Sequence, residues 1–290
     1  MSAIALFGAS GYIGSAIRSE LAGRGMEVIP VGRKNCDCAS FDALHSFLRH
    51  LRPAIVINAA GYTGNPNVDA CEKDKEACFD ANVRLPMAIA AACARLDITL
   101  GHVSSGCIYS GMDRFRWVET DTPNFSFPSP PSSFYSGTKA AAECLLAQFR
   151  KTYLWRLRIP FDHQNHRKNY ISKLLTYPKL LNATNSLSHR GDFVKACVDM
   201  WMKGAPFGIY NLTNPGFVTT RQVVGLIQEH LPSNRKFEFW ESETEFYRHR
   251  AIAPRSNCVL DTAKAESVGV RMRSVIEALE DSLRKWSETG

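Results

Sequence analysis

The chain has 290 residues, of which 45% are hydrophobic and 22% are charged, and its formal net charge is +7. This composition is typical of a globular protein with a full hydrophobic core, and no apolar run approaches the roughly 20 residues that a membrane span needs. The basic residues are scattered and form no long run, so we expect neither a nucleic acid nor a membrane as a partner.

The N-terminus and the cysteines indicate a reducing, cytoplasmic compartment. Residues 1–7 have no basic segment before a short apolar stretch, which argues against a signal peptide. The 9 cysteines are an odd number and include no Cys-x-x-Cys pair, so we expect free thiols and no zinc site. His163 and His166 lack third and fourth partners at a suitable spacing, and we therefore expect no metal.

The first half of the chain alternates strand-like and helix-like segments. We expect strands at 3–7, 27–31, 54–57 and 98–103, and helices at 12–22, 41–51 and 77–94. Strands that alternate with helices form a parallel sheet that is covered on both faces. The predicted fold class is therefore α/β, with a doubly wound parallel sheet.

The alternation loosens after residue 119. Prolines, serines and threonines over residues 119–133 predict a loop. The remaining predicted elements are a helix at 134–151, strands at 153–159 and 207–211, a helix from Thr219 or Thr220 to Leu231, and a last helix with Val275, Leu279, Leu283 and Trp286 on one apolar stripe.

A glycine-rich turn, from Gly8 to Gly14, follows the first predicted strand and opens a helix. Glycines at three-residue spacing permit a tight turn and let a pyrophosphate approach the backbone, while the helix N-terminus offers free N–H groups. In this context the turn predicts dinucleotide binding, although a plain packing turn is the alternative. The residues expected to bind the dinucleotide are Gly8, Ser10, Gly11, Tyr12, Ile13 and Gly14.

The ends of the next two strands help to select the cofactor. A site that binds NAD usually has an acidic residue at the end of the second strand, but this chain has Arg33 and Lys34 there. Arg33 could pair with a 2′-phosphate, so we expect NADPH; otherwise both residues are solvated loop charges. The third strand ends in Asn58, Ala59 and Ala60, which let a cofactor lie against the backbone, although a tight turn alone also explains such residues.

Tyr135 and Lys139 share one face of a predicted helix because they are four residues apart. A lysine there is expected to lower the pKa of the tyrosine, so that the phenol donates its proton near neutral pH. The fourth strand ends in Ser104-Ser105-Gly106-Cys107, and the Ser105 hydroxyl can hold a substrate carbonyl beside the tyrosine.

Together the glycine turn, the strand-end serine and Tyr-x-x-x-Lys are the signature of the short-chain dehydrogenases/reductases, and the chain resembles their extended branch. Further blocks resemble the plant and viral epimerase/reductases that form UDP-rhamnose and, more distantly, the dTDP-4-dehydrorhamnose reductases. These blocks lie at 58–72, 106–108, 134–139, 169–173, 211–216 and 253–257. A serine- and proline-rich insert at 126–133 departs from the family pattern.

The resemblance implies an NADPH-dependent reductase that acts on a nucleotide-linked 4-keto-6-deoxyhexose. Tyr135 would protonate the C4 oxygen, Ser105 would hold it, and Lys139 would also bind the nicotinamide ribose. Cys107 and Lys173 would exchange protons at C3 and C5, because a thiol is easily tuned for such work; a packing cysteine and a solvated lysine are the plainer alternatives. The remaining implied contacts are Pro160 to the cofactor and Thr63, Asn169, Arg255 and Asn257 to the substrate.

Two other functions are open at this point. A reductase without epimerase activity would resemble dTDP-4-dehydrorhamnose reductase. A non-catalytic partner protein would resemble the regulatory subunit of methionine adenosyltransferase, but the presence of Ser105, Tyr135 and Lys139 favours catalysis. We divide the chain into a dinucleotide-binding domain, residues 1–160, and a smaller substrate-binding lobe, residues 161–290, partly interleaved with the first. The sequence does not decide between UDP and dTDP, and it leaves a homodimer open.

Overall fold

The computed structural model describes residues 3–111, 116–232 and 235–286. Its centre is a six-stranded sheet in the order β10-β5-β4-β3-β1-β2, and every neighbouring pair is parallel. The strands are β1 (Ile4–Phe7), β2 (Val28–Val31), β3 (Ile55–Asn58), β4 (Leu100–Ser105), β5 (Thr152–Leu157) and β10 (Gly208–Asn211). The predicted doubly wound α/β fold is confirmed, and the order of the strands reverses between β1 and β3.

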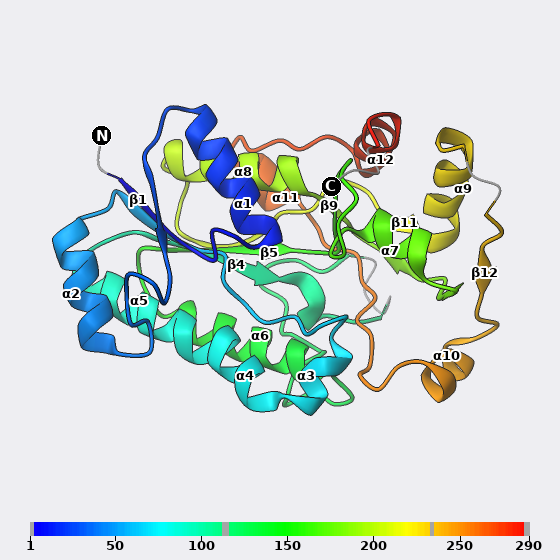
Figure 1. Cartoon of the computed structure of the whole chain (residues 1–290), viewed down its shortest axis with the longest axis horizontal. Coiled ribbons are helices and arrows are strands. Elements are labelled where there is room, and N and C mark those ends of the chain that lie inside the picture. Colours follow the sequence, from blue (N-terminus) through cyan, green and yellow to red (C-terminus); the bar gives the residue numbers. More distant parts are fainter. Residues whose placement is uncertain (1–2, 112–115, 233–234, 287–290) are drawn as a thin grey trace.

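Helices cover both faces of this sheet (Figure 1). On one face α1 (Tyr12–Gly23) and α8 (Arg190–Met202) share a hydrophobic cluster with β1 and β5. On the other face α2 (Phe41–Leu51), α5 (Leu85–Arg95) and α6 (Phe134–Leu146) pack in a second cluster. The Ser40 side chain caps α2 by accepting from the Ala43 N–H, which fixes where this helix begins.

The alanine-rich helix predicted at 77–94 is interrupted. It consists of α4 (Lys75–Phe79), a π-helical turn (Asp80–Arg84) and α5. The buried Asn82 side chain lies in this turn and exchanges two hydrogen bonds with the Tyr62 backbone, each 2.9 Å long. Among the described residues, Lys75–Arg95 is the helical stretch long and apolar enough to cross a membrane by length and composition, and 44% of its most apolar 18-residue window is buried.

A smaller body lies beside the carboxyl ends of the strands, at the right of Figure 1. Its helices α7 (Tyr170–Thr176), α9 (Thr220–His230) and α12 (Val275–Arg284) enclose a separate hydrophobic cluster. Capping boxes at Thr219 and Ser274 begin α9 and α12. The segments α8 and β10 return to the large sheet, so the chain crosses between the two bodies more than once.

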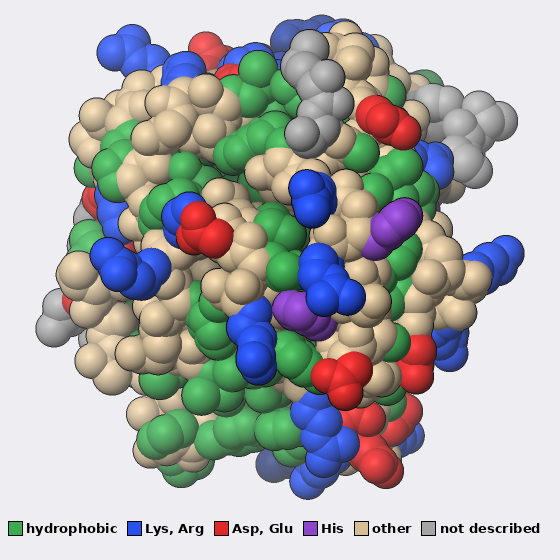
Figure 2. Space-filling model, turned by 90° about the vertical axis from the view of Figure 1, so that its left-hand side faces the viewer, with side chains coloured by type: hydrophobic (Ala, Val, Ile, Leu, Met, Phe, Trp, Pro, Cys, Tyr) green, Lys and Arg blue, Asp and Glu red, His purple; other side chains and the backbone are tan. Residues whose placement is uncertain are grey.

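The remaining elements are short. They are α3 (Asp69–Lys73), a 3-10 turn (Gly106–Ile108), β6 (Pro160–Phe161), β7 (Lys179–Leu180), β8 (Thr184–Asn185), β9 (Ser188–His189), β11 (Val218–Thr219), β12 (Glu238–Phe239), α10 (Glu243–His249) and α11 (Ala263–Ser267). Helix α6 ends at Leu146, earlier than predicted. On the side of the molecule where α2 lies, Figure 2 shows lysine and arginine side chains interspersed with acidic and neutral ones.

Candidate active site

The glycine-rich turn lies where the order of the strands reverses. Gly8 has a φ of 72°, and a Cβ placed on it would lie 2.5 Å from the backbone nitrogen of Ala60. A Cβ on Gly14 would lie 2.0 Å from the carbonyl oxygen of Gly8. Both positions therefore require glycine, because backbone packs directly against backbone: Gly8 against the end of β3, and the start of α1 against Gly8.

A cavity of about 490 Å³ opens beside this turn, at the carboxyl ends of the strands. The sequence-predicted residues that line it are Gly11, Tyr12, Ile13, Ala59, Ala60, Thr63, Ser105, Cys107, Tyr135, Lys139, Pro160, Lys173, Arg255 and Asn257. Within the described part of the chain, every charged residue in its lining is basic: Lys139, Arg167, Lys168, Lys173, Lys179, Arg250 and Arg255. Such a lining suits ligands that carry several negative charges.

Other predicted residues lie outside the walls of this cavity. Gly8 and Gly14 shape the turn and do not face the space. Ser10 lines a smaller hollow beside the start of α1, together with His166 and Arg190. Arg33 is exposed just beyond the end of β2.

Asn58 and Asn169 were predicted to contact the ligands, but both are fully buried. The Asn58 amide bonds to the ring of His102 at 3.1 Å and accepts from the Ala60 N–H at 3.0 Å. Asn169 caps α7 and donates to the Asp162 side chain at 2.9 Å. Because the protein itself satisfies both amides, these side chains shape the walls, and their contacts with the ligands stay predictions.

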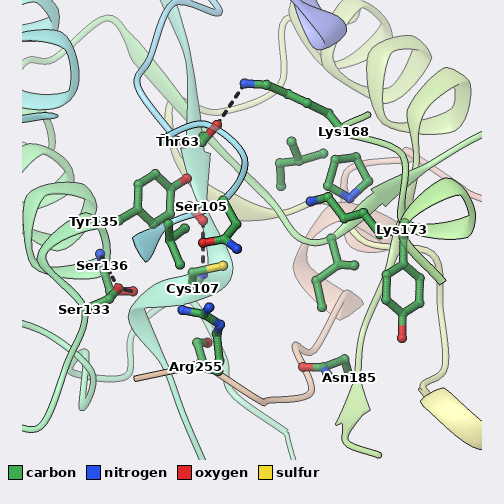
Figure 3. Close-up of a pocket in the computed structure, with 18 of the residues that line it drawn as sticks. Thr63, Ser105, Cys107, Ser133, Tyr135, Ser136, Lys168, Lys173, Asn185 and Arg255 are labelled. Carbon is green, nitrogen blue, oxygen red and sulfur yellow. Dashed lines mark hydrogen bonds between the residues drawn. The ribbon is translucent and has the colours of Figure 1, made fainter. Parts of the chain in front are cut away.

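Ser105 and Tyr135 lie side by side on one wall of the cavity (Figure 3). Lys139 also lines this cavity. The start of α6 is fixed by Ser133, which accepts from the Ser136 N–H at 3.0 Å, and by Glu72, which accepts from the Phe134 N–H at 2.7 Å. This start places Tyr135 over the end of β4. There Ser105 accepts from the Cys107 N–H at 3.1 Å.

The ionisation of Tyr135 and Lys139 differs from the prediction. Burial raises the pKa of Tyr135, and Cys107 adds to the effect, while Lys139 is not among the groups that lower it. The Lys139 ammonium donates to the Val103 carbonyl at 3.0 Å, and burial lowers its pKa to about 8. The expected lowering of the Tyr135 pKa is therefore corrected. The phenol keeps its proton near neutral pH, as an ordinary tyrosine does, and the raised pKa makes it a weaker acid in this structure than the sequence predicted.

Cys107 and Lys173 lie on opposite sides of the cavity in Figure 3. Cys107 is partly exposed in the 3-10 turn after β4, and Lys173 projects from α7. Burial lowers the pKa of Lys173, and Lys168 and Arg255 add to this effect. The pair therefore offers a thiol and an amine to two sides of a ligand between them.

The sequence reasoning missed Lys168, which donates to Thr63 at 2.8 Å across the cavity wall. Burial lowers the pKa of Lys168. The one feature of the sequence that could have indicated Lys168 is its position directly before the block at 169–173. Arg255 lines the cavity, but its positive charge is paired with Asp69. The two side chains form a bidentate ion pair with distances of 2.9 and 2.8 Å.

Asn185 and Arg158 were also missed. Asn185, on β8, lines the cavity and donates to the Asn257 side chain at 3.3 Å. Arg158 follows β5 and lies behind Cys107, where its Nη1 is 3.6 Å from the sulfur. No pattern in the sequence distinguishes either residue from an ordinary polar position.

A family model described as "RmlD substrate binding domain" matches residues 1–287. The chain belongs to this family. Among curated members related to it, a trifunctional UDP-glucose 4,6-dehydratase/UDP-4-keto-6-deoxy-D-glucose 3,5-epimerase/UDP-4-keto-L-rhamnose-reductase of Arabidopsis thaliana is 32% identical over 249 residues, which are 82% of this chain and 35% of the relative. The chain therefore spans about a third of that protein's length.

A second plant relative is close to this chain in length. It is the bifunctional dTDP-4-dehydrorhamnose 3,5-epimerase/dTDP-4-dehydrorhamnose reductase of Arabidopsis thaliana, 29% identical over 281 residues, with 94% of this chain and 90% of the relative covered. The crystal structure of a UDP-rhamnose synthase from Acanthamoeba polyphaga mimivirus has a TM-score of 0.88 at 24% identity and covers 97% of this chain and 98% of its own. That structure shares the fold of the RmlD-family chain described above.

Another structural neighbour contains a nucleotide. It is a dTDP-4-dehydrorhamnose reductase from Bacillus anthracis in complex with NADP, with a TM-score of 0.82 at 19% identity and coverage of 98% of both chains. This likeness again concerns the fold, whose glycine turn and sheet edge are described above.

Proposed function

We propose that the protein is an NADPH-dependent 4-ketoreductase of a nucleotide-linked 4-keto-6-deoxyhexose, and that it also epimerises the sugar at C3 and C5. One observation carries the proposal: a single cavity joins the start of α1, the Ser105–Tyr135–Lys139 wall and the Cys107–Lys173 pair, and its charged lining is basic throughout the described residues. Membership of the RmlD family and the activities named for the two plant relatives support the same assignment.

The residues at the glycine turn fit a dinucleotide. The turn lies so close to Ala60 that no side chain could stand at Gly8, and the first residues of α1 face the cavity. NADPH would be held by the start of α1 at Gly11 to Ile13, by Ala59, Ala60 and Pro160, and by Lys139. When bound, it supplies the hydride that reduces C4 of the sugar.

The protein's own part in the reduction is to hold and protonate the C4 oxygen. Ser105 donates a hydrogen bond to this oxygen, and Tyr135 gives it a proton. The buried Lys139 ammonium would bind the nicotinamide ribose and supply a positive charge there. Lys168, Lys179 and Arg250 extend the basic lining and suit the diphosphate of the sugar nucleotide.

Cys107 and Lys173 would act before the reduction. A ketone at C4 acidifies the hydrogens at C3 and C5. One member of the pair takes a proton while the electron pair of the C–H bond passes into an enolate, and the other member returns a proton to the opposite face of the ring. Their positions on two sides of the cavity support a mechanism in which one residue removes the proton and the other returns one.

Turnover of UDP- and dTDP-4-keto-6-deoxyglucose with NADPH tests the proposed function. We expect NADPH absorbance to fall with at least one of them, and NMR to identify a nucleotide-linked 6-deoxyhexose formed in equal amount. UDP-glucose, which has no ketone, is the control. A folded protein that consumes NADPH with neither keto sugar would refute the proposal.

Arg33 is expected to select NADPH over NADH. Removing its contact with the 2′-phosphate in Arg33→Ala should weaken NADPH binding by about 1.5–3 kcal/mol, or roughly 10- to 150-fold, and should leave NADH binding unchanged. Fluorescence titration of both cofactors measures the effect, with Lys34→Ala as the neighbouring control. Equal affinity of the unmodified protein for NADH and NADPH would contradict this role.

Lys139 is expected to set the alkaline limit of the reduction. Because burial lowers its pKa from the ordinary 10.5 to about 8, the side chain is charged below this pH and loses its charge as the pH rises through it. The value of kcat/KM for NADPH should therefore fall above about pH 8. Arginine stays charged, so the activity that remains in Lys139→Arg should lack this fall. A pH profile of Lys139→Arg with the same falling limb would sink the assignment.

A further inference from the structure

Arg158 is a buried cation without an acidic partner among the described residues. It is 1% exposed, and its hydrogen bonds to the protein reach neutral acceptors and a thiol. The nearby Arg156 is equally buried but forms an ion pair with Glu143 at 2.7 Å. Buried charges are normally compensated. The contrast between the two arginines points to a negative charge that forms close to Arg158 while the protein works.

The Cys107 thiol lies directly against this cation. Arg158 Nη1 is 3.6 Å from the sulfur, and the same nitrogen donates to the Gly106 carbonyl at 3.4 Å. The guanidinium therefore sits behind the turn that carries Cys107, while Cys107 itself lines the cavity. Arg158 can act on a ligand through the sulfur.

The guanidinium is also fixed from its other side. It donates to the Ser256 carbonyl at 2.8 Å, to the Ser256 hydroxyl at 3.0 Å and to Asn185. Both partners also line the cavity, and Arg158 cannot turn away from Cys107 without breaking several hydrogen bonds. A charge held in this way needs no rearrangement during a reaction.

We propose that Arg158 is a positioning residue that stabilises negative charge on the Cys107 sulfur during proton exchange at the sugar ring. This inference rests on the proposed epimerase activity. The direction of transfer does not matter: a sulfur that takes the C–H proton begins as a thiolate, and a sulfur that returns the proton to the enolate ends as one. Lys173 carries the complementary proton in each case.

Other titratable groups also face Cys107. Tyr135 and Lys139 approach from α6 and Lys173 from α7, and all three lie close enough to the sulfur for its charge to affect their ionisation. Burial raises the pKa of Cys258 to about 11, so this thiol is neutral near neutral pH. Arg158 differs from these groups because its charge does not change over the working range of pH.

Alkylation of Cys107 by iodoacetamide tests the inference without any need for turnover. The rate is followed across pH by mass spectrometry of the Cys107 peptide. We expect Arg158→Gln to slow alkylation at neutral pH by about tenfold or more and to move the profile to higher pH. Arg158→Lys keeps the charge and should retain most of the rate. Arg284→Gln removes an exposed arginine from the end of α12 and is the control that should leave the rate unchanged.

Deuterium uptake at C3 and C5 separates this inference from the activity on which it rests. A wild-type protein without uptake would refute the epimerase, whereas a shifted alkylation profile in Arg158→Gln would still support the action of Arg158 on Cys107. An unchanged profile in a folded Arg158→Gln protein would overturn the inference, whatever the uptake shows. If that variant does not fold, the wild-type profile still tests the inference, because a midpoint near 8.5, as in a free thiol, overturns it.

Discussion

Replacing Tyr135 with phenylalanine is expected to slow reduction of the keto sugar by about 10²- to 10⁴-fold. The change keeps the aromatic ring at the start of α6 and removes the hydroxyl that protonates the C4 oxygen. Since burial raises the pKa of Tyr135, the lost group is a phenol that carries its proton at neutral pH. The rate of NADPH oxidation at saturating keto sugar measures the effect.

Tyr62→Phe makes the same chemical change at a half-buried tyrosine whose side chain does not line the cavity, and it is the matched control. We expect it to reduce the sugar at the wild-type rate. NADPH titration should show that Tyr135→Phe still binds the cofactor. Reduction at near wild-type speed in Tyr135→Phe would eliminate this residue as the proton donor.

Replacing Cys107 with serine is expected to abolish uptake of deuterium from D₂O at C3 and C5. Serine is similar in size but far less acidic, so it cannot exchange protons at a useful rate near neutral pH. Reduction of a keto sugar that is already epimerised should continue, because that step depends on Ser105, Tyr135 and Lys139. NMR of the recovered sugar nucleotide measures the uptake at each carbon.

Cys258→Ser is the control for this experiment, because Cys258 is a fully buried thiol that bonds to the Gly106 carbonyl behind the same turn. It should leave the uptake of deuterium intact. Lys173→Met should reproduce the loss seen in Cys107→Ser if the two residues work on opposite faces of the ring. Undiminished uptake in folded Cys107→Ser would show that the cysteine fills space and does no chemistry.

The fold could be predicted wherever local signals and packing agree. Helix α2 was predicted with its observed bounds, because Ser40 caps its start and its apolar face is regular. The π-helical turn before α5 was not predicted. It accompanies hydrogen bonds of Asn82 to the Tyr62 backbone and to Thr138, residues far away in the sequence. Helix α6 was predicted too long, because its alanine-rich pattern gave no stop signal near Leu146.

The site could be predicted where function follows a local motif. The glycine turn, Ser105, Tyr135, Lys139 and Cys107 are at or beside one cavity, as their positions after strands implied. Spacing alone could not foresee how their polar atoms are paired. Lys139 shares a helix face with Tyr135, as predicted, yet its ammonium donates to the Val103 carbonyl.

Polar partners from distant strands and loops explain the other differences. Asn169 belongs to one of the sequence blocks, but its side-chain amide caps α7 and donates a hydrogen bond to Asp162. Arg158 belonged to no motif. Its side chain is surrounded by neutral partners because the fold brings the end of β5 together with β8 and the segment around Ser256. Such pairings depend on the assembled fold and leave no periodic trace in the sequence.

A single isotope experiment tests the central claim most directly. UDP-4-keto-6-deoxyglucose and its dTDP counterpart are each incubated in D₂O with NADPH that carries deuterium at the position of the transferred hydride, and the product is examined by NMR. The account predicts a nucleotide-linked 6-deoxyhexose with deuterium from the cofactor at C4 and solvent deuterium at C3 and C5. A product from either substrate that lacks cofactor deuterium at C4, or NADPH left unconsumed with both, would contradict it.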